Sequence, residues 1–476
     1  MKAISVKEIV NIVGGKLLFP NENCDKDSIN SIILDHVEVD SRRLRKGSLF
    51  VAINGENTDG HKYVPNALAS ADAVFIEKDL NYISEASGVD VLPPNKAYIY
   101  VDSTIQALQD LGAYFRKQYD KPVIAVTGSV GKTTTREMIT WAISSNLKVY
   151  TTKGNRNSQI GVPLTLVDIL DEPSDISVLE LGISEDGGMD KLTSMVKPDI
   201  AVVTIIGVAH IEFLKTKENI RDEKLKICSR MDEDGILFLN GDDKLLSEMK
   251  GKTGVNTFYY GINSKSHFRA EDIHPEDGFY TYDYCHKDKK IKVRLSVFGE
   301  HNVLNSLVSM AICDYLDLDL EKAAKSFETF KGLRQTIHEN SKGVIVIDDS
   351  YNASPDSMRV AIQLLDNYTD DSHEIKRKIA VLGDMFELGT ESRMYHEEVG
   401  GYVASSAIDE LILLGDESEY IGSVASKNTG IVIKHFTSNE YASEYLDESL
   451  SAGDVVLIKA SNGMKLSEIA NHLKNQ

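Results

Sequence analysis

Residues 122–138, "PVIAVTGSVGKTTTREM", constrain the fold of this chain more than any other stretch. An apolar, β-branched run is followed by a short glycine-containing turn and then by a helix-forming segment. The spacing Gly128-Ser129-Val130-Gly131-Lys132-Thr133 has about two residues fewer between its glycines than the phosphate-loop pattern G-x-x-x-x-G-K-[ST]. Glycines let the backbone turn its N–H groups inward, and the N-terminus of the next helix favours an anion. The stretch therefore predicts a buried strand, a compressed phosphate loop and a helix.

The rest of the chain extends this strand–helix alternation and predicts an α/β protein with three domains. Short apolar runs separated by helical patterns indicate parallel sheets covered on both faces. We expect a small mixed α/β N-terminal domain at 1–103, a central doubly wound, phosphate-loop ATPase-like domain at 104–330, and a C-terminal Rossmann-like α/β domain at 331–476. A polar stretch at about 252–298 predicts a small antiparallel excursion.

The composition narrows the class of partner. Lys and Arg number 52 against 73 Asp and Glu, giving a formal net charge of -21. Such an acidic chain is a poor ligand for nucleic acids or anionic membranes. Apolar runs long enough to span a bilayer and a signal-peptide pattern are both absent, and the four cysteines show no metal-binding spacing. We expect a cytoplasmic protein without membrane insertion, whose phosphate site is built locally.

Side chains around the loop suggest nucleotide and metal binding. Lys132 can reach the β- and γ-phosphates, and the hydroxyl of Thr133 is placed for Mg²⁺. Magnesium bound to phosphates usually takes one or two carboxylates as well. Glu180 ends the run "ISVLELG" and His210 ends "IAVVTIIGVAH", so both are expected beside the loop, at the same edge of the sheet. Each could be an ordinary loop residue, but together they predict a metal cluster.

Six motifs carry a resemblance to a known family: "TGSVGKTTT", "KGNRNSQIGVP", "LELG", "IGVAHIEFL", "GEHNVLNSLVSM" and "IDDSYNASPDSM". In order and spacing they resemble the Mur ligase family, the cytoplasmic ATP-dependent enzymes that build the peptide stem of peptidoglycan. The stretches "DDSYNASPDSM" and "VLGDMFELGTESRMYH" look like the member that adds D-alanyl-D-alanine to a UDP-sugar tripeptide. The N-terminal "DSRRLRKGSLFVAINGENTDGH" resembles the UDP-sugar domain of that member.

The resemblance implies a reaction. ATP would phosphorylate the terminal carboxylate of the acceptor peptide, and the amine of a dipeptide would attack the acyl phosphate. ATP and Mg²⁺ are the implied cofactors, and the implied partners are a UDP-sugar peptide and a dipeptide. Such chemistry asks mainly for positioning and for neutralisation of charge on oxygen.

The resemblance also assigns residues by their place in the motifs. Lys224 matches the family's carbamylated lysine, a ligand of the second Mg²⁺, although a lysine in so charged a helix is usually solvated. Arg334 and Asp349 match groups that reach ATP from the third domain. The implied catalytic residues are Lys132, Lys224, His210 and Arg334, and the implied magnesium ligands are Thr133, Glu180, His210 and Lys224. The implied ATP site comprises Gly128, Ser129, Val130, Gly131, Lys132, Thr133, Thr134, His301, Asn302, Asn305, Arg334 and Asp349.

Substrate residues are less specific. The implied set is Ser41, Arg42, Asn155, Asn157, Ser158, Tyr351, Asn352 and Ser354. Residues of these types also stabilise loops and cap helices, so a purely structural role stays open for this set.

Three departures from the family pattern concern the substrates. Gly188, Ile205 and Asn462 stand where the family usually has Glu, Asn and Arg. The ATP residues are intact, so the open alternatives are a divergent paralogue acting on another acceptor and a folylpolyglutamate-type ligase, with a catalytically dead scaffold as a third. The sequence leaves open whether the third residue of the acceptor is lysine or diaminopimelate. We expect a monomer.

Overall fold

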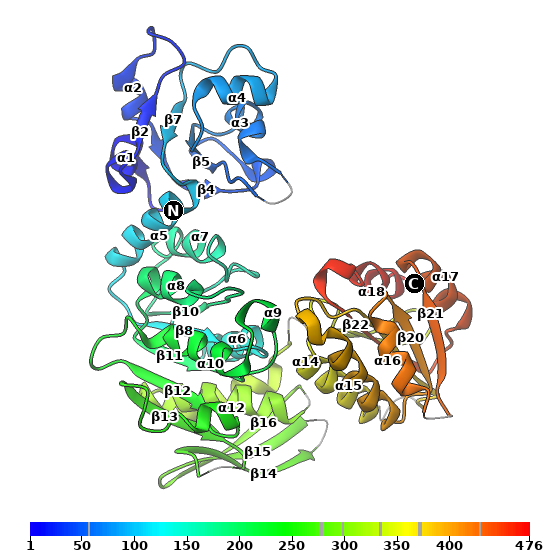
Figure 1. Ribbon diagram of the computed structural model, residues 1–476. Helices are drawn as coiled ribbons and strands as arrows, with labels where there is room; N and C mark the ends of the chain where they lie inside the picture. The colour runs from blue at the N-terminus through cyan, green and yellow to red at the C-terminus, as the bar shows by residue number, and fades with distance from the viewer. Residues whose placement is uncertain are drawn as a thin grey trace.

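Each of three regions of the chain is built around its own large sheet (Figure 1). The computed structural model describes residues 1–55, 58–263, 265–276, 279–297, 299–332, 336–369, 374–427 and 430–476. Within these ranges, sheets of five, nine and six strands follow one another along the chain. Figure 1 shows the N-terminal region in blue above the central region, with the C-terminal region in orange and red at one side. The predicted α/β class with three units is confirmed.

The N-terminal region is a small mixed sheet. The strand order is β2-β7-β6-β5-β4, in which β4 to β7 are parallel and β2 is antiparallel to β7. Its first helix, α1 (Val6–Val13), begins at a capping box formed by Ser5 and Glu8 and ends at Gly14 in the left-handed conformation. The strands are β2 (Lys16–Leu18), β4 (His36–Glu38), β5 (Ser48–Val51), β6 (Ala73–Ile76) and β7 (Ala97–Tyr100), and β1 (Ile4–Ser5) pairs with β3 (Ile33–Leu34). The remaining helices are α2 (Lys26–Asn30), α3 (Val64–Leu68) and α4 (Leu80–Ser87).

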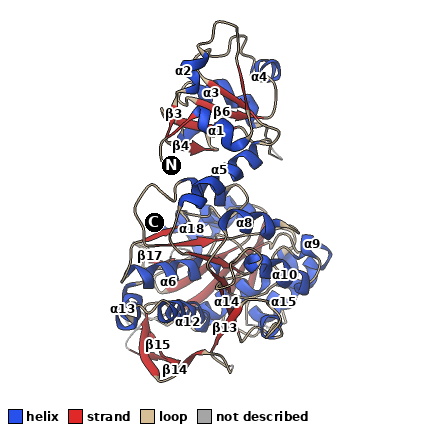
Figure 2. Ribbon diagram, turned by 90° about the vertical axis from the view of Figure 1, so that its left-hand side faces the viewer, coloured by secondary structure: helices blue, strands red, loops and turns tan. Residues whose placement is uncertain are grey.

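The central region is a doubly wound sheet in which β8 lies between β11 and β10, in the order β16-β15-β14-β13-β12-β11-β8-β10-β9. Figure 2 shows helices on both sides of its strands. The parallel strands are β8 (Val123–Thr127), β9 (Val149–Thr151), β10 (Ile176–Glu180), β11 (Ile200–Val203), β12 (Ile236–Asn240) and β13 (Asn256–Gly261). The helices are α5 (Thr104–Gln118), α6 (Lys132–Ser144), α7 (Gly161–Val167), α8 (Gly188–Val196), α9 (Ile211–Leu214), α10 (Lys217–Leu225), α11 (Lys244–Ser247), α12 (Glu300–Tyr315) and α13 (Leu320–Ser326).

The stretch at 252–298 differs in part from the expected excursion. Its strands β14 (Phe268–Glu276), β15 (Phe279–His286) and β16 (Lys289–Leu295) pair antiparallel with one another, as predicted. However, β14 also pairs in parallel with β13, so the hairpin strands continue the central sheet. Buried aromatic side chains of these strands, including Phe268 and Tyr282, pack against α12 within one apolar core.

The C-terminal region is a second doubly wound sheet, in the order β17-β18-β22-β19-β20-β21. Only the edge strand β17 (Thr336–Glu339) is antiparallel to its neighbour among the described strands. The others are β18 (Ile345–Asp348), β19 (Arg377–Gly383), β20 (Glu410–Leu414), β21 (Val432–Phe436) and β22 (Asp454–Lys459). The helices are α14 (Pro355–Asp366), α15 (Ser392–Ala404), α16 (Ser418–Ala425), α17 (Asn439–Ser449) and α18 (Ser467–Lys474), with α14 and α15 nearest the central region in Figure 1.

The apolar cores show how the regions are joined. One core runs without a break from the N-terminal sheet, through Leu49 and Phe75, to Leu108 of α5 and Leu164 of α7. The C-terminal region has cores of its own, one of which includes Val208 of the central region. No helix in the described part of the chain is both long and apolar enough to cross a membrane.

Candidate active site

The phosphate loop has the predicted strand–turn–helix form. It leaves β8 after Thr127 and enters α6 at Lys132. Gly128 and Gly131 have φ of 154° and 84°, a region that favours glycine, and a Cβ atom on Gly128 would lie 1.9 Å from Thr204 Oγ1. The segment after β11 holds the turn in place, because the Thr204 hydroxyl donates to the Val130 carbonyl at 2.6 Å. Only glycine fits the narrowest point of this loop.

The same segment explains why Ile205 is compatible with the loop. The Ser129 N–H donates to the carbonyl of Ile205 at 2.7 Å, a bond that any residue can accept. The side chain at position 205 is therefore not what holds the loop, although it lines the cavity described below.

A carboxylate lies beside the loop, as expected from the strand order. β10 pairs directly with β8, which brings Glu180 next to the start of α6. The Thr133 hydroxyl donates to Glu180 Oε2 at 2.8 Å, and Asn157 Nδ2 donates to Glu180 Oε1 at 2.7 Å. Arg136 Nε lies 3.5 Å from Glu180 Oε2, so the buried carboxylate has a cation nearby. The hydroxyl and carboxylate predicted to serve a metal are in contact.

Two lysines approach this point. Lys132 Nζ donates to the carbonyls of Gly128 and Ser129 at 2.9 and 3.3 Å, so its charge lies against the loop. Lys224, on α10, is 1% exposed, and its ammonium group makes no hydrogen bond or ion pair within the described residues. Burial, and then the nearby charge of Lys132, hold the pKa of Lys224 well below its usual value. Lys224 is not the solvated helix lysine of the alternative reading.

His210 lies farther from its strand than the pattern suggested. β11 ends at Val203, and His210 follows in the loop that leads to α9, with φ of 65°. Its Nδ1 lies 2.5 Å from Glu387 Oε2 of the C-terminal region. The imidazole beside it lowers the pKa of Glu387. His210 thus lies where the two regions meet. Among the described residues, no three His, Cys, Asp or Glu side chains are grouped closely enough to hold a metal ion.

The central and C-terminal regions enclose a cavity of about 440 Å³. Most of the predicted ATP residues line it from the central side, namely Ser129, Val130, Gly131, Lys132, Thr133, Thr134, His301, Asn302 and Asn305. His210, predicted for the metal, lines it as well, whereas Gly128 does not. From the C-terminal side it is lined by Asp349, Tyr351, Asn352 and Ser354. Glu180 and Lys224 lie behind the loop and outside the lining. Arg334 lies outside the described residues.

The start of α12 closes the cavity on the central side. Thr135, on the helix that follows the phosphate loop, donates its hydroxyl to Asn305 Oδ1 at 3.0 Å, and Asn305 Nδ2 lies 3.4 Å from Asn302 Oδ1. Burial, together with the charge of Arg359 from α14, lowers the pKa of His301 to about 4. His301 is therefore neutral at physiological pH and suits a neutral ring better than a phosphate.

On the C-terminal side a buried lysine organises the loop after β18. Lys459 Nζ donates to Asp349 Oδ2 and to the Asn352 carbonyl, both at 2.8 Å. Asn462, a departure from the family pattern, donates its amide to the Tyr351 carbonyl at 3.1 Å. Ser354 caps α14 through Ser357, so its hydroxyl has the structural role that the sequence left open.

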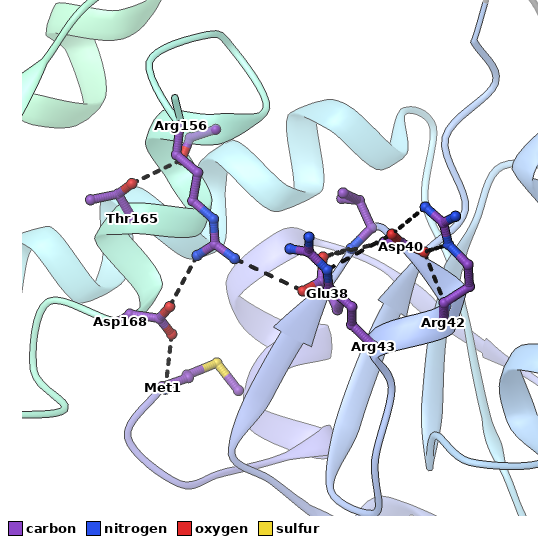
Figure 3. Close-up of polar contacts among 10 residues, drawn as sticks. Met1, Glu38, Asp40, Arg42, Arg43, Arg156, Thr165 and Asp168 are labelled. Carbon is purple, nitrogen blue, oxygen red and sulfur yellow. Dashed lines mark hydrogen bonds and ion pairs between the residues drawn. The ribbon is translucent and has the colours of Figure 1, made fainter. Parts of the chain in front are cut away.

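Arg42, another predicted substrate residue, lies on the N-terminal side of the other junction, where the N-terminal and central regions meet (Figure 3). Ser41 and Arg42 form a short 3₁₀ turn in which Arg42, with an 86% exposed side chain, pairs with Asp40 at 2.8 Å. The pKa of Asp40 is lowered to about 2, chiefly by its hydrogen bonds from Arg42.

The loop of residues 155–158 lies between this turn and the phosphate loop. Arg156 is 3.3 Å from Asp168 and 3.9 Å from Glu38, the strand residue just before that turn, while the next residue, Asn157, holds Glu180. The Ser158 hydroxyl accepts from backbone N–H groups at the start of α7. Asn155 is exposed.

The motifs did not identify several residues that line the cavity, namely Asp356, Arg359, Phe386, Glu387 and Lys459. Asp356 and Arg359 lie in or next to the quoted stretch "YNASPDSM", one helical turn apart, and that spacing was an available signal. Phe386 and Glu387 lie in the quoted stretch "VLGDMFELGTESRMYH", to which no residue role was given, whereas Lys459 lies outside the quoted stretches and is brought to the cavity by the fold.

Comparison with known proteins agrees with this geometry. Three family models match, described as "Mur ligase middle domain" at residues 126–313, "Mur ligase, glutamate ligase domain" at 333–462 and "Mur ligase family, catalytic domain" at 34–116. The chain is 34% identical over 474 residues to the UDP-N-acetylmuramoyl-tripeptide–D-alanyl-D-alanine ligase of Bacillus subtilis, with 98% of each chain covered. It is 28% identical over 481 residues to the Escherichia coli enzyme of the same name, covering 100% of this chain and 99% of that one.

Solved structures agree as well. MurF from Acinetobacter baumannii superposes with a TM-score of 0.85 at 26% identity, over 100% of this chain and 99% of that one. The MurF ligase of Thermotoga maritima, solved in complex with ADP, has a TM-score of 0.77 at 27% identity, over 94% and 98% of the two chains. With its phosphate loop, its three regions and these full-length matches, the chain belongs to the Mur ligase family.

Proposed function

We propose that this protein is an ATP-dependent amide ligase that adds D-alanyl-D-alanine to UDP-N-acetylmuramoyl-tripeptide through an acyl phosphate, in peptidoglycan precursor synthesis. The observation that carries the proposal is the cavity of about 440 Å³, in which the phosphate loop of one region faces Tyr351 and Asn352 of another. Relatives that bear the name of this activity match the chain from end to end.

The three regions divide the substrates. We assign residues 1–103 to the UDP-sugar acceptor, 104–330 to ATP, and 331–476 to the dipeptide and to closure over ATP. Support for these boundaries comes from the sheets, each of which falls within one segment. We infer a monomeric enzyme that acts in the cytoplasm, where ATP and UDP-linked precursors are found.

ATP occupies the cavity in this proposal. Backbone N–H groups of residues 128–134 and the Lys132 ammonium neutralise the phosphates. His301, Asn302 and Asn305 bind on the adenine side, supported by the neutral state of His301 and the bonded pair of asparagines. Asp349 accepts from the ribose, and its bond to Lys459 holds the carboxylate in position. Arg334 adds charge to the phosphates.

Magnesium would be held by Thr133, Glu180, His210 and a carbamylated Lys224, and would neutralise charge on the phosphate oxygens when bound. The residues fit such a site: the Thr133 and Glu180 oxygens are in contact, and Lys224 is buried without a partner among the described residues. Burial lowers the pKa of Lys224 and so favours its neutral amine, which is the form that reacts with CO₂. A carbamate is a hard oxygen ligand of the kind that Mg²⁺ prefers.

The residues of the chain then serve two displacement steps. An oxygen of the acceptor carboxylate forms a bond to the γ-phosphorus, and ADP leaves. The dipeptide ammonium first releases a proton to water, and the neutral amine forms a bond to the acyl carbon. The nitrogen then loses a second proton, and inorganic phosphate leaves. Lys132 stabilises charge on the transferred phosphoryl group during both steps. The walls of the cavity hold the reacting groups together and limit the access of water.

Ser41, Arg42, Asn155, Asn157 and Ser158 are proposed for the acceptor, and Tyr351, Asn352 and Ser354 for the dipeptide. Asn157 and Ser354 already make internal bonds, so they act by shaping their loops as well as by touching substrate. Of the departures, Asn462 stands at the dipeptide side and Ile205 at the phosphate loop, and both line the cavity.

Phosphate release tests the proposal. The purified protein is mixed with ATP, Mg²⁺, D-alanyl-D-alanine and UDP-N-acetylmuramoyl-tripeptide, with lysine or diaminopimelate as the third residue in parallel samples. We expect release that requires both substrates and a product of the summed mass less water. Equal release with glutamate as the amine and a folate as the acceptor would contradict the proposal. No release with any pair would favour the inactive scaffold.

A further inference from the structure

The cavity lining contains three carboxylates within the described residues, and two of them already have a basic side chain as a partner. Asp349 Oδ2 lies 2.8 Å from Lys459 Nζ, and Glu387 Oε2 lies 2.5 Å from His210 Nδ1. The third, Asp356, makes no hydrogen bond or ion pair within the described part of the chain. A carboxylate that faces a cavity without a partner is suited to a cationic ligand.

Asp356 lies beside the reaction centre. It stands in the first turn of α14 and reaches across the junction to Gly207, in the loop after β11. A Cβ atom on Gly207 would lie 2.3 Å from Asp356 Oδ2 and 3.4 Å from Ser129 Cβ. The carboxylate is therefore within a few ångströms of the phosphate loop, although it belongs to the other region of the protein.

The surroundings of Asp356 favour positive charge. Burial raises the pKa of the nearby Asp243, and the negative charge of Asp356 raises it further. Arg359 follows one turn later on α14, makes no ion pair with Asp356, and directs its charge towards His301. The two charges on this helix thus serve different parts of the cavity, and Asp356 and Asp243 place negative charge beside a loop whose own cation is Lys132.

We propose that Asp356 binds the ammonium group of the incoming dipeptide and holds that nitrogen beside the phosphate loop, where the acyl phosphate forms. The inference rests on the proposed function and deepens it. The ammonium donates hydrogen bonds to the carboxylate, and such charge-assisted bonds are about twice as strong as neutral ones. Asp356 belongs to the C-terminal region and the phosphate loop to the central region. The contact between Asp356 and the ammonium therefore brings the nucleophile to the loop only when the two regions are closed together.

The test separates the two half-reactions of the full enzyme. Hydroxylamine, which is largely uncharged near neutral pH, replaces the dipeptide as nucleophile and traps the acyl phosphate as a hydroxamate. Wild type, Asp356→Asn and Asp356→Glu are compared for hydroxamate formation and for KM and kcat with D-alanyl-D-alanine. Glu440→Gln is the matched control, because Glu440 is a first-turn acid of α17 outside the cavity lining. This control shows how far KM and kcat change when a helix loses only a favourable negative charge in its first turn.

We expect Asp356→Asn to raise KM for D-alanyl-D-alanine on the order of tenfold or more, with hydroxamate formation within about twofold of wild type. Asp356→Glu should recover part of the loss, and Glu440→Gln should behave as wild type. An unchanged KM in Asp356→Asn would overturn the inference while leaving the proposed function intact. Equal loss of hydroxamate and peptide product would also overturn it, by assigning Asp356 to folding or to ATP. Failure of the wild type to form hydroxamate would overturn the proposed function, and the inference with it.

Discussion

The two junctions of the molecule are built in different ways. The N-terminal and central regions share one continuous apolar core, and Arg156 adds an ion pair to Glu38 across their boundary (Figure 3). The central and C-terminal regions enclose a cavity instead, and touch through a few contacts such as His210–Glu387 and the Glu212 N–H bond to the Glu387 carbonyl. Separating the first junction would open one continuous apolar core, whereas the second is bridged by single polar contacts and by Val208, which packs into a core of the C-terminal region. The difference suggests a fixed platform on one side and a closing element on the other.

The strongest test of the junction that encloses the cavity removes the lysine of the phosphate loop. Lys132→Ala should lower ligation on the order of 10²-fold or more, because Lys132 is the cation that the loop itself presents to the transferred phosphoryl group. Activity within a few-fold of wild type would mean that the phosphates bind elsewhere. Lys121→Ala is the control, since Lys121 is exposed and precedes the opposite end of β8. Circular dichroism should show both variants folded.

The second test concerns the buried lysine behind the loop. Lys224→Ala should be nearly inactive, and a short carboxylic acid or bicarbonate should partly restore turnover by replacing the carbamate oxygens. Mass spectrometry of the wild type at neutral pH should detect added CO₂ on Lys224. Full activity in the variant would contradict the assignment. Lys217→Ala, an exposed site on the same helix, should leave turnover unchanged.

The contrast between the two junctions is tested by measuring whether the C-terminal region moves when ligands bind. An ATP analogue with acceptor should decrease the radius of gyration in small-angle scattering, because closure draws the C-terminal region onto the phosphate loop. Hydrogen exchange should slow in the loops that contain His210 and Glu387 and remain nearly constant around Glu38 and Asp168. Identical scattering with and without ligands would contradict a closing element. Slowed exchange at the N-terminal boundary alone would reverse the roles of the two junctions.

The smallest effect is expected at the charged boundary. Arg156→Met removes two ion pairs from a side chain that is 23% exposed, so the free energy of unfolding should fall by only about 0–1 kcal/mol. If Arg156 also orients the turn with Ser41 and Arg42, KM for the acceptor should rise a few-fold, with kcat and KM for ATP unchanged. Arg156→Lys should recover the acceptor KM. Arg45→Met, which removes an exposed ion pair inside the N-terminal region, should leave it unchanged.

Much of the fold was predictable because its signals are local. Runs such as 123–127 and 176–180 are apolar and β-branched, and the strands they form are buried throughout. The strand–turn–helix at Gly128–Lys132 depends on neighbouring residues, so its geometry follows from the glycines and the helix start. The pairing of Glu180 with Thr133 required one further step, that neighbouring parallel strands end at the same edge of a sheet. At 252–298 the local signal predicted the antiparallel strands and missed their pairing with β13, which is a long-range contact.

The sequence by itself determined the α/β class, the phosphate loop with Lys132 and Thr133, and, through its motifs, the family. These depend on residues that are close together in the chain. Only the tertiary structure decided that Glu387 meets His210, that Lys459 holds Asp349, and that Asp356 faces the cavity without a partner among the described residues. Each of these facts depends on how separate sheets lie relative to one another. A side chain's charge is written in the sequence, but whether that charge is neutralised or left for a ligand depends on which distant residues the fold brings near it.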